Sequence, residues 1–259
     1  MTHPAYGVLR PVIDSESLIA SVLLCDNPGI MTLDGTNTWV LRAPGSEELV
    51  VVDPGPDDSA HIDRLSALGR VSLVLISHRH GDHTDGIDKI VDATGATVRA
   101  VGSGFLRGLG GQLRDGEVID AAGVRITVMA TPGHTADSVS FVVDGAVLTG
   151  DTVLGRGTTV IDDEDGSLAS YLDSLRRLQG LGRLAVLPGH GPDLDDIQAV
   201  STMYLAHREE RLDQVRQALR VLGEQASARE VVAHVYTDVD EKLWDAAEKS
   251  VRAQLDYLR

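Results

Sequence analysis

Aromatic residues and cysteine are scarce in this chain of 259 residues. Phe, Trp and Tyr together make up 3% of it, so a buried core has to be built from Val, Leu, Ile and Ala. The single cysteine, Cys25, excludes an internal disulfide and a two-cysteine redox motif. We therefore expect Cys25 to be a small buried hydrophobe.

Long apolar runs are also missing. No run approaches the roughly 20 residues that a membrane helix needs. Residues 1–6 lack the basic start and apolar centre of a signal peptide. We therefore expect no membrane partner and a cytoplasmic location.

Positive charge is in short supply. Lys and Arg number 23 against 39 Asp and Glu, which gives a net charge of -16. This balance repels polyanions at long range. It argues against duplex DNA as a partner and, more mildly, against RNA, because Lys and Arg supply most of the affinity for phosphates.

Histidine, in contrast, is concentrated in short motifs, and the densest lies at residues 77–83. The apolar residues 73–76 before it are typical of a strand buried on both faces. His78 and His80, two apart at the end of this strand, point the same way, and Gly81 then turns the chain toward a second point. Zinc accepts imidazole and carboxylate where a position must stay open for water, so the motif predicts a metal site. Its candidate ligands are His78, His80, Asp82 and His83.

Three further motifs each follow an apolar run and carry one histidine or aspartate. They contribute His134 within residues 131–135, Asp151 within residues 149–152 and His190 within residues 187–191. A strand that ends in a glycine-containing turn aims a ligand side chain from a rigid support. We therefore expect these three side chains to join the metal site.

The order of these motifs, His-x-His-x-Asp-His, Pro-Gly-His, Gly-Asp and Pro-Gly-His, resembles the metallo-β-lactamase-fold hydrolases. The resemblance implies two zinc ions, with iron or manganese as alternatives. It also implies that Asp53, at the end of an earlier apolar run, supports a ligand from behind. The implied ligands are His78, His80 and His134 for one ion, Asp82, His83 and His190 for the other, and Asp151 as a bridge.

Residues 27–29, 32–38 and 150–160 resemble a narrower branch, the lactamase-beta-like proteins that include an endoribonuclease. The implied fold is α+β: a four-layer αββα sandwich over residues 1–200, with a small helical, winged-helix-like appendage over residues 201–259. Helical periodicity is present at residues 59–69, 84–94 and 167–180, and then at 200–222, 227–234 and 240–258. The appendage lacks a clustered basic face and reaches residue 259 before a wing hairpin. We expect it to pack against the first domain or to form a homodimer.

The resemblance implies a hydrolase in which two metal ions hold a bridging hydroxide. This hydroxide attacks an ester, thioester, lactone or amide. Asp82, both ligand and carboxylate, is the candidate to accept the proton, and no motif identifies the acid that protonates the leaving group. We expect a small anionic substrate, with a polar cluster on the long helix as its clamp unless that cluster is only a solvated face. The cluster consists of Tyr204, His207, Arg208 and Arg211.

Three alternatives to this hydrolase stay open. The first is a single-strand endoribonuclease that uses the same hydroxide on a phosphodiester, with single-stranded RNA as its partner. The second is an iron-dependent sulfur oxygenase, because the ligands suit iron as well as zinc. The third is a metal-stabilised binding protein without catalytic activity, which the intact ligand set disfavours.

Overall fold

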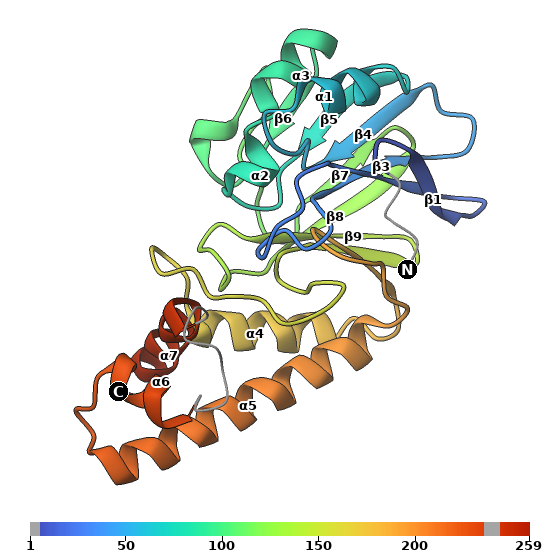
Figure 1. Ribbon diagram of the computed structural model, residues 1–259. Coiled ribbons are helices and arrows are strands. Elements are labelled where there is room, and N and C mark those ends of the chain that lie inside the picture. The colour runs from blue at the N-terminus through green and yellow to red at the C-terminus, as the bar shows by residue number, and fades with distance from the viewer. Residues whose placement is uncertain (1–5, 236–243) are drawn as a thin grey trace.

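Two mixed β-sheets form the centre of the molecule (Figure 1). The computed structural model describes residues 6–235 and 244–259. The first sheet has six strands in chain order: β1 (Leu9–Asp14), β2 (Ile19–Leu24), β3 (Asn37–Arg42), β4 (Glu48–Val52), β5 (Arg70–Leu75) and β6 (Thr97–Arg99). The second has five, in the order β11 (Ala185–Pro188), β10 (Ala146–Gly150), β9 (Val139–Val143), β8 (Val124–Ala130) and β7 (Val118–Ala121). Neighbouring strands are antiparallel except within β4–β5–β6 and β10–β11.

Alternate side chains of the first sheet fill two different layers. In β4, Val50 and Val52 belong to the core between the sheets, whereas Leu49 and Val51 pack toward α1 (Ser59–Ser66) and α3 (Ile87–Thr94). This period of two is what a strand covered on both faces requires. Helices α1 and α3 therefore form the layer outside the first sheet (Figure 1).

Helices α4 (Leu168–Gln179) and α5 (Ile197–Leu222) cover the outer face of the second sheet (Figure 1). Tyr171 and Leu175 of α4 pack there with Val147 of β10 and Val186 of β11. The layers follow in the order helix, sheet, sheet, helix, so the predicted αββα sandwich is confirmed. The helices predicted at residues 59–69, 84–94 and 167–180 are confirmed as well, within a few residues at each end.

Helix α5 extends beyond the sandwich. Its first part packs against α4, whereas Val215 and Ala218 pack with α6 (Ala228–Val235) and α7 (Trp244–Leu258). The helix crosses residue 200, so the division into two domains at that residue stays a prediction, as does a homodimer. Residues 240–243 of the last predicted helix lie outside the described residues. None of the helices in the described part combines the length and apolar character that crossing a bilayer requires.

The two sheets are joined at one edge, where several strands end. The backbone N–H of Val139 donates to the carbonyl of Ser77, just after β5 (2.8 Å), and that of Asn37 donates to the carbonyl of Gly189, just after β11 (2.8 Å). Strands β8, β10 and β11 run in the same direction, because β8 and β10 are both antiparallel to β9. Their carboxyl ends therefore meet at this edge, and the segments that follow them carry the predicted ligands.

Candidate metal centre

Three histidines from the two sheets surround one point. His80 Nδ1 lies 3.1 Å from His78 Nε2 and 3.0 Å from His134 Nε2. In a tetrahedral zinc site with bonds of about 2.0–2.1 Å, two ligand nitrogens lie roughly 3.3 Å apart. The three nitrogens are therefore spaced as the ligands of one cation are. His78 and His80 come from the end of β5, and His134 comes from the turn after β8.

A second group lies beside the first. His83 Nε2 is 3.2 Å from His190 Nε2, and His190 Nε2 is 3.1 Å from Asp82 Oδ2. Asp82 and His83 lie on the one-turn helix α2 (Gly81–Thr84), and His190 follows β11. The turn at Gly81 thus directs these two side chains to a different point from His78 and His80, as the sequence predicts.

Asp151, just after β10, lies between the two groups. Its Oδ2 is 3.3 Å from His190 Nε2 and 3.9 Å from His134 Nε2. Its Oδ1 is buried and has no hydrogen-bond partner among the described residues. A buried carboxylate oxygen is normally paired, so an orphaned one between two nitrogen clusters fits a place where cations bind. Imidazole and carboxylate donors in this arrangement suit two divalent ions such as zinc or iron.

The ring nitrogen that faces away from the centre is held in four of the histidines. His134 Nδ1 donates to the carbonyl of Val160 (2.6 Å), and His190 Nδ1 donates to the carbonyl of Gly35 (3.1 Å). His78 Nδ1 lies 3.0 Å from Ser77 Oγ, and His83 Nδ1 lies 2.9 Å from Asp53 Oδ2. Such contacts fix the tautomer, so that the lone pair on Nε2 faces the metal position.

Asp53 connects both groups. Its Oδ1 accepts from the backbone N–H of Ser77 (2.7 Å), and its Oδ2 accepts from Ser77 Oγ (2.6 Å) as well as from His83. Ser77 Oγ in turn contacts His78, so one buried carboxylate orients a histidine of each group. The backbone of Asp53 has a φ of 55°, in the left-handed region that a non-glycine residue rarely adopts. This local strain aims the carboxylate at Ser77 and His83.

The two groups differ in their protonation. Burial lowers the pKa of His78 well below its usual value, and it lowers that of His80 with help from the neighbouring His134. Burial acts in the same direction on His190, but the carboxylates of Asp151 and Asp82 outweigh it and raise the pKa to about 11. His83 is likewise raised against burial, by Asp53 and Asp151. In the absence of cations, His190 therefore holds a proton at neutral pH that a metal must displace.

The predicted substrate cluster on α5 consists of two buried and two half-buried side chains. The Tyr204 side chain is buried, and its hydroxyl accepts from the backbone N–H of Leu154 (3.1 Å) and donates to the carbonyl of Gly157 (3.0 Å). Arg208 is also buried, donates to the carbonyl of Thr159 and lies over the ring of Tyr171, 5.1 Å from its centroid. Both side chains thus hold the backbone of the loop after Asp151 through hydrogen bonds.

The remaining two members of that cluster are half-buried. Arg211 donates to Gln214 Oε1 at 2.7 Å, one helical turn away. The pKa of His207 is lowered, first by burial and then by the positive charges of Arg211 and Arg208. A role for these two residues in holding substrate stays a prediction.

A pocket of about 230 Å³ opens beside His134 and Asp151. One wall is the loop between β2 and β3, with Ile30, Met31 and Leu33, and the other is the loop after β10. The sequence gives no sign of this wall, because an exposed aliphatic pair in a loop acquires meaning only when the fold brings it beside the ligands. The residues of the second wall are Leu154, Arg156, Gly157, Thr158, Thr159 and Val160.

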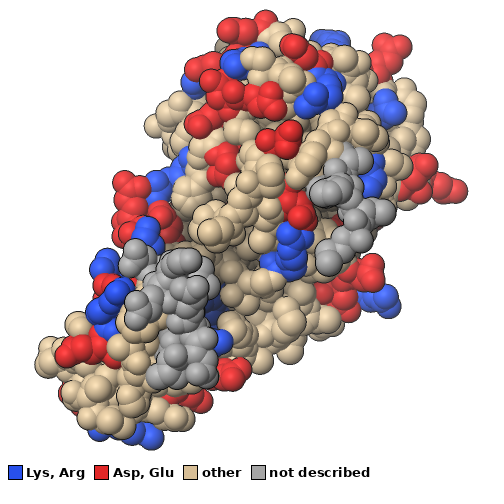
Figure 2. Space-filling view, in the orientation of Figure 1, with Lys and Arg blue, Asp and Glu red and all other residues tan. Residues whose placement is uncertain are grey.

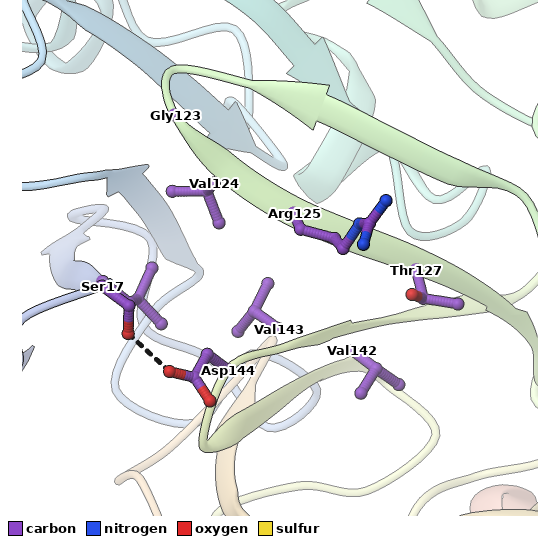
Figure 3. A pocket seen from close by; sticks show the side chains of 9 residues that line it. Ser17, Gly123, Val124, Arg125, Thr127, Val142, Val143 and Asp144 are labelled. Atoms are coloured by element: carbon purple, nitrogen blue, oxygen red, sulfur yellow. Dashed lines mark hydrogen bonds between the residues drawn. The ribbon is translucent and has the colours of Figure 1, made fainter.

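A larger hollow, of about 370 Å³, lies between the turns before β2, before β8 and after β9 (Figure 3). It contains none of the metal-ligand residues. Ser17 Oγ donates to Asp144 Oδ2 at 2.5 Å within it, so the serine and the carboxylate already bind each other (Figure 3). The smaller pocket is therefore the one that can place a substrate at the ligand cluster.

Residues 31–190 match the family described as the metallo-beta-lactamase superfamily, and residues 227–259 match the beta-lactamase associated winged helix domain. A beta-lactamase-like protein 2 homolog of Caenorhabditis elegans is 32% identical over 243 residues, which cover 87% of this chain and 79% of that protein. An atrochrysone carboxyl ACP thioesterase of Aspergillus fumigatus is 33% identical over 221 residues, covering 81% of this chain and 68% of that protein. The crystal structure of a beta-lactamase domain protein from Burkholderia ambifaria has the same fold, with a TM-score of 0.80 at 22% identity over 99% of this chain and 89% of that one.

Proposed function

The chain belongs to the metallo-β-lactamase superfamily, and from this premise we propose that it is a dizinc hydrolase of an ester or thioester. The observation that carries the proposal is the convergence of the predicted ligands on two adjacent points, with Asp151 between them. Two divalent ions held there would lower the pKa of a bound water toward neutrality and polarise the carbonyl oxygen. In the overall reaction the oxygen of water joins the acyl carbon, the C–S or C–O bond breaks, and an acid and a thiol or alcohol are released.

Asp82 is the residue that we propose to accept and pass on the proton of water. Its side chain is 27% exposed, against 12% for Asp151, so it is the more open of the two carboxylates. Burial raises its pKa, but the hydrogen bond with His190 and the charge of His83 outweigh burial and lower it below the usual value. Asp82 is therefore ionised at neutral pH, as a residue that accepts a proton must be.

Acyl substrates are favoured over RNA by the pairing of the arginines near the pocket. Arg79, between two ligands in sequence, forms ion pairs with Asp162, Glu164 (2.5 Å) and Asp165 (3.2 Å). Arg156 is paired with Asp34. On the face shown in Figure 2, basic side chains lie singly or in small groups beside acidic ones. Strong binding of phosphates would require a groove of unpaired Lys and Arg.

The relative named as a thioesterase supports a thioester among the acyl substrates. Zinc rather than iron is proposed because hydrolysis needs a Lewis acid and no change of oxidation state, which suits a metal without redox chemistry. The donor set itself accepts both metals, so metal analysis also separates this hydrolase from an iron-dependent oxygenase.

The test compares neutral thioesters and lactones with a labelled single-stranded RNA, before and after removal of metal by a chelator. We expect hydrolysis of an acyl substrate that disappears on chelation and returns with zinc, while RNA stays intact. Asp82→Asn should lose this activity, whereas Asp92→Asn, at an exposed position of α3, should keep it. RNA cleavage that requires Asp82 and is faster at low salt would assign the endoribonuclease function instead.

A further inference from the structure

The tip of the loop between β2 and β3 exposes two large apolar side chains beside the metal ligands. Ile30 is 85% exposed and Met31 is 58% exposed, yet both line the pocket that reaches His134 and Asp151. The tip is held in place by its own bonds: Gly29 N–H donates to the carbonyl of Leu33 (3.2 Å), and Thr32 Oγ1 donates to the carbonyl of Asn27 (2.6 Å). Exposed aliphatic side chains on a braced loop form a preformed surface that an apolar ligand can cover.

The opposite wall of the pocket is partly apolar. Leu154 and Val160 face it, and the hydroxyl of Thr159 is engaged, because Thr159 Oγ1 donates to the carbonyl of Asp151 (2.8 Å). Apart from the metal ligands, the polar residues of the lining are Arg156, Thr158 and Thr159. A pocket of this composition recognises shape and hydrophobicity, with its few polar groups fixing orientation.

The cation at the rim of the pocket is neutralised. Arg156 binds Asp34 through two hydrogen bonds, one of them 2.9 Å long between Nη2 and Oδ1. Asp34 belongs to the same loop as Ile30, so the ion pair joins the two walls. A bidentate arginine–carboxylate pair leaves the guanidinium poorly placed to bind the carboxylate of a substrate.

The acidic turn beyond Val160 adds negative charge near the site. Asp162, Glu164 and Asp165 surround Arg79, and Asp163 binds Lys249 of α7 at 3.1 Å. The turn thus contributes four carboxylates, which are paired with Arg79 and Lys249 from other parts of the chain. The excess of negative charge disfavours an anionic group on this side of the pocket.

We propose that the pocket binds the acyl part of the substrate, that this acyl group is uncharged and apolar, and that Ile30 and Met31 determine the selectivity. This inference rests on the proposed hydrolase function. The sequence leads us to expect an anionic substrate, and its negative charge would then lie on the thiol or alcohol part. The Asp34–Arg156 pair excludes acyl chains that end in a carboxylate, because it occupies the cation that such a chain would bind.

The experiment uses octanoyl and suberoyl thioesters of N-acetylcysteamine, which have the same chain length and differ in a terminal carboxylate. We expect kcat/KM to be at least about tenfold higher for octanoyl, because a buried charge without a partner is disfavoured. The Ile30→Ser/Met31→Ser double variant should raise KM for octanoyl about tenfold and leave butyryl hydrolysis nearly unchanged, since each lost apolar contact weakens binding. Leu109→Ser, at a leucine that is 102% exposed and outside the pocket lining, is the matched control.

A gain of activity sharpens the test. Asp34→Asn frees Arg156 and should raise kcat/KM for suberoyl about tenfold, while Asp34→Asn/Arg156→Ala should lose that gain. Equal rates for octanoyl and suberoyl, or no effect of the Ile30→Ser/Met31→Ser change, would overturn the inference.

Binding is measured separately, so that failure of the function can be told from failure of the inference. Calorimetry with the S-octyl thioether of N-acetylcysteamine, which cannot be hydrolysed, needs no catalysis. Binding by the unaltered protein that the double variant loses supports the inference even if no thioester is turned over, in which case only the proposed function fails. Equal binding by both proteins, or by neither, contradicts the inference.

Discussion

The ligand cluster and the pocket beside it are built in opposite ways. Each ligand follows a strand end or the turn after it and lies in a motif of a few residues, and four of the histidines are held by Ser77, Asp53 or the carbonyls of Gly35 and Val160. The pocket walls are loops, and residues distant in sequence support them: Tyr204 holds Leu154, and Arg208 holds Thr159. The difference teaches that the metal ligands of this protein are specified by short motifs at strand ends, whereas the walls of its pocket are loops that carry no such motif.

The largest effect is expected from breaking the ligand cluster. Asp151→Ala removes the carboxylate between the two groups and should lower kcat by at least about 10³-fold, because several kcal/mol of stabilisation depend on the metals. Metal content per chain, measured by elemental analysis, should fall as well. Asp144→Ala is the control and should retain full activity, because the Asp144 carboxylate accepts a hydrogen bond from Ser17 away from the metal ligands. An Asp151→Ala protein with normal metal content and rate would contradict the role assigned to the bridge.

A smaller effect on metal affinity is expected from a change of Asp53, which contacts His83 and Ser77. Asp53→Asn keeps the size of the side chain but weakens its contacts with His83 and Ser77, so metal affinity should fall about 10- to 100-fold. Titration with a chelator that competes for zinc measures this change. Circular dichroism should stay native, because the apolar cores on both sides of β4 are unchanged. Unaltered zinc affinity would show that Asp53 supports only the fold.

A variant that weakens the support of the pocket walls should change the KM for substrate rather than the metal content. Tyr204→Phe removes the hydroxyl that binds Leu154 and Gly157, and we expect KM to rise about threefold to tenfold, in line with the roughly 1 kcal/mol that one hydrogen bond contributes. Metal content should not change. His207→Ala and Arg211→Ala then decide the predicted clamp, since a rise in KM with constant kcat would support direct contact with substrate. If both leave KM unaltered, these residues form only the face of a helix.

The smallest effect concerns pH. His190, with its pKa raised to about 11, is protonated in the metal-free protein at pH 7, and the pKa of His83 is raised as well, whereas a metal ligand must be neutral. Zinc affinity should therefore increase with pH, and binding at pH 7 should release protons. For the metal-free protein the sign is opposite: the raised pKa of His190 contributes stability that is present below about pH 6.5 and is lost as the pH rises toward about 11. Calorimetry in two buffers with different ionisation enthalpies measures the proton release, and binding without release would refute this account.

Sequence reasoning predicts the two regions unequally. The four layers and the convergence of the ligands follow from apolar runs that end in Gly- or Asp-containing turns, and each such motif can be interpreted alone. The pocket cannot be predicted in this way, because Ile30 and Val160 come to line the same pocket only after the two sheets have packed. Arg208 is predicted to be part of a clamp for an anion, and the structure places it one helical turn from both Tyr204 and Leu212 on the buried face of α5. The spacing of four residues between Tyr204, Arg208 and Leu212 is the signal in the sequence that predicts a buried position for Arg208.

The most direct test of the central claim is anomalous X-ray diffraction at the zinc absorption edge, on crystals of the protein as purified. The account predicts two peaks per chain: one among His78, His80 and His134, the other among Asp82, His83 and His190, with Asp151 between them. A single peak, peaks elsewhere, or no peak in crystals of active protein would contradict a two-metal hydrolase.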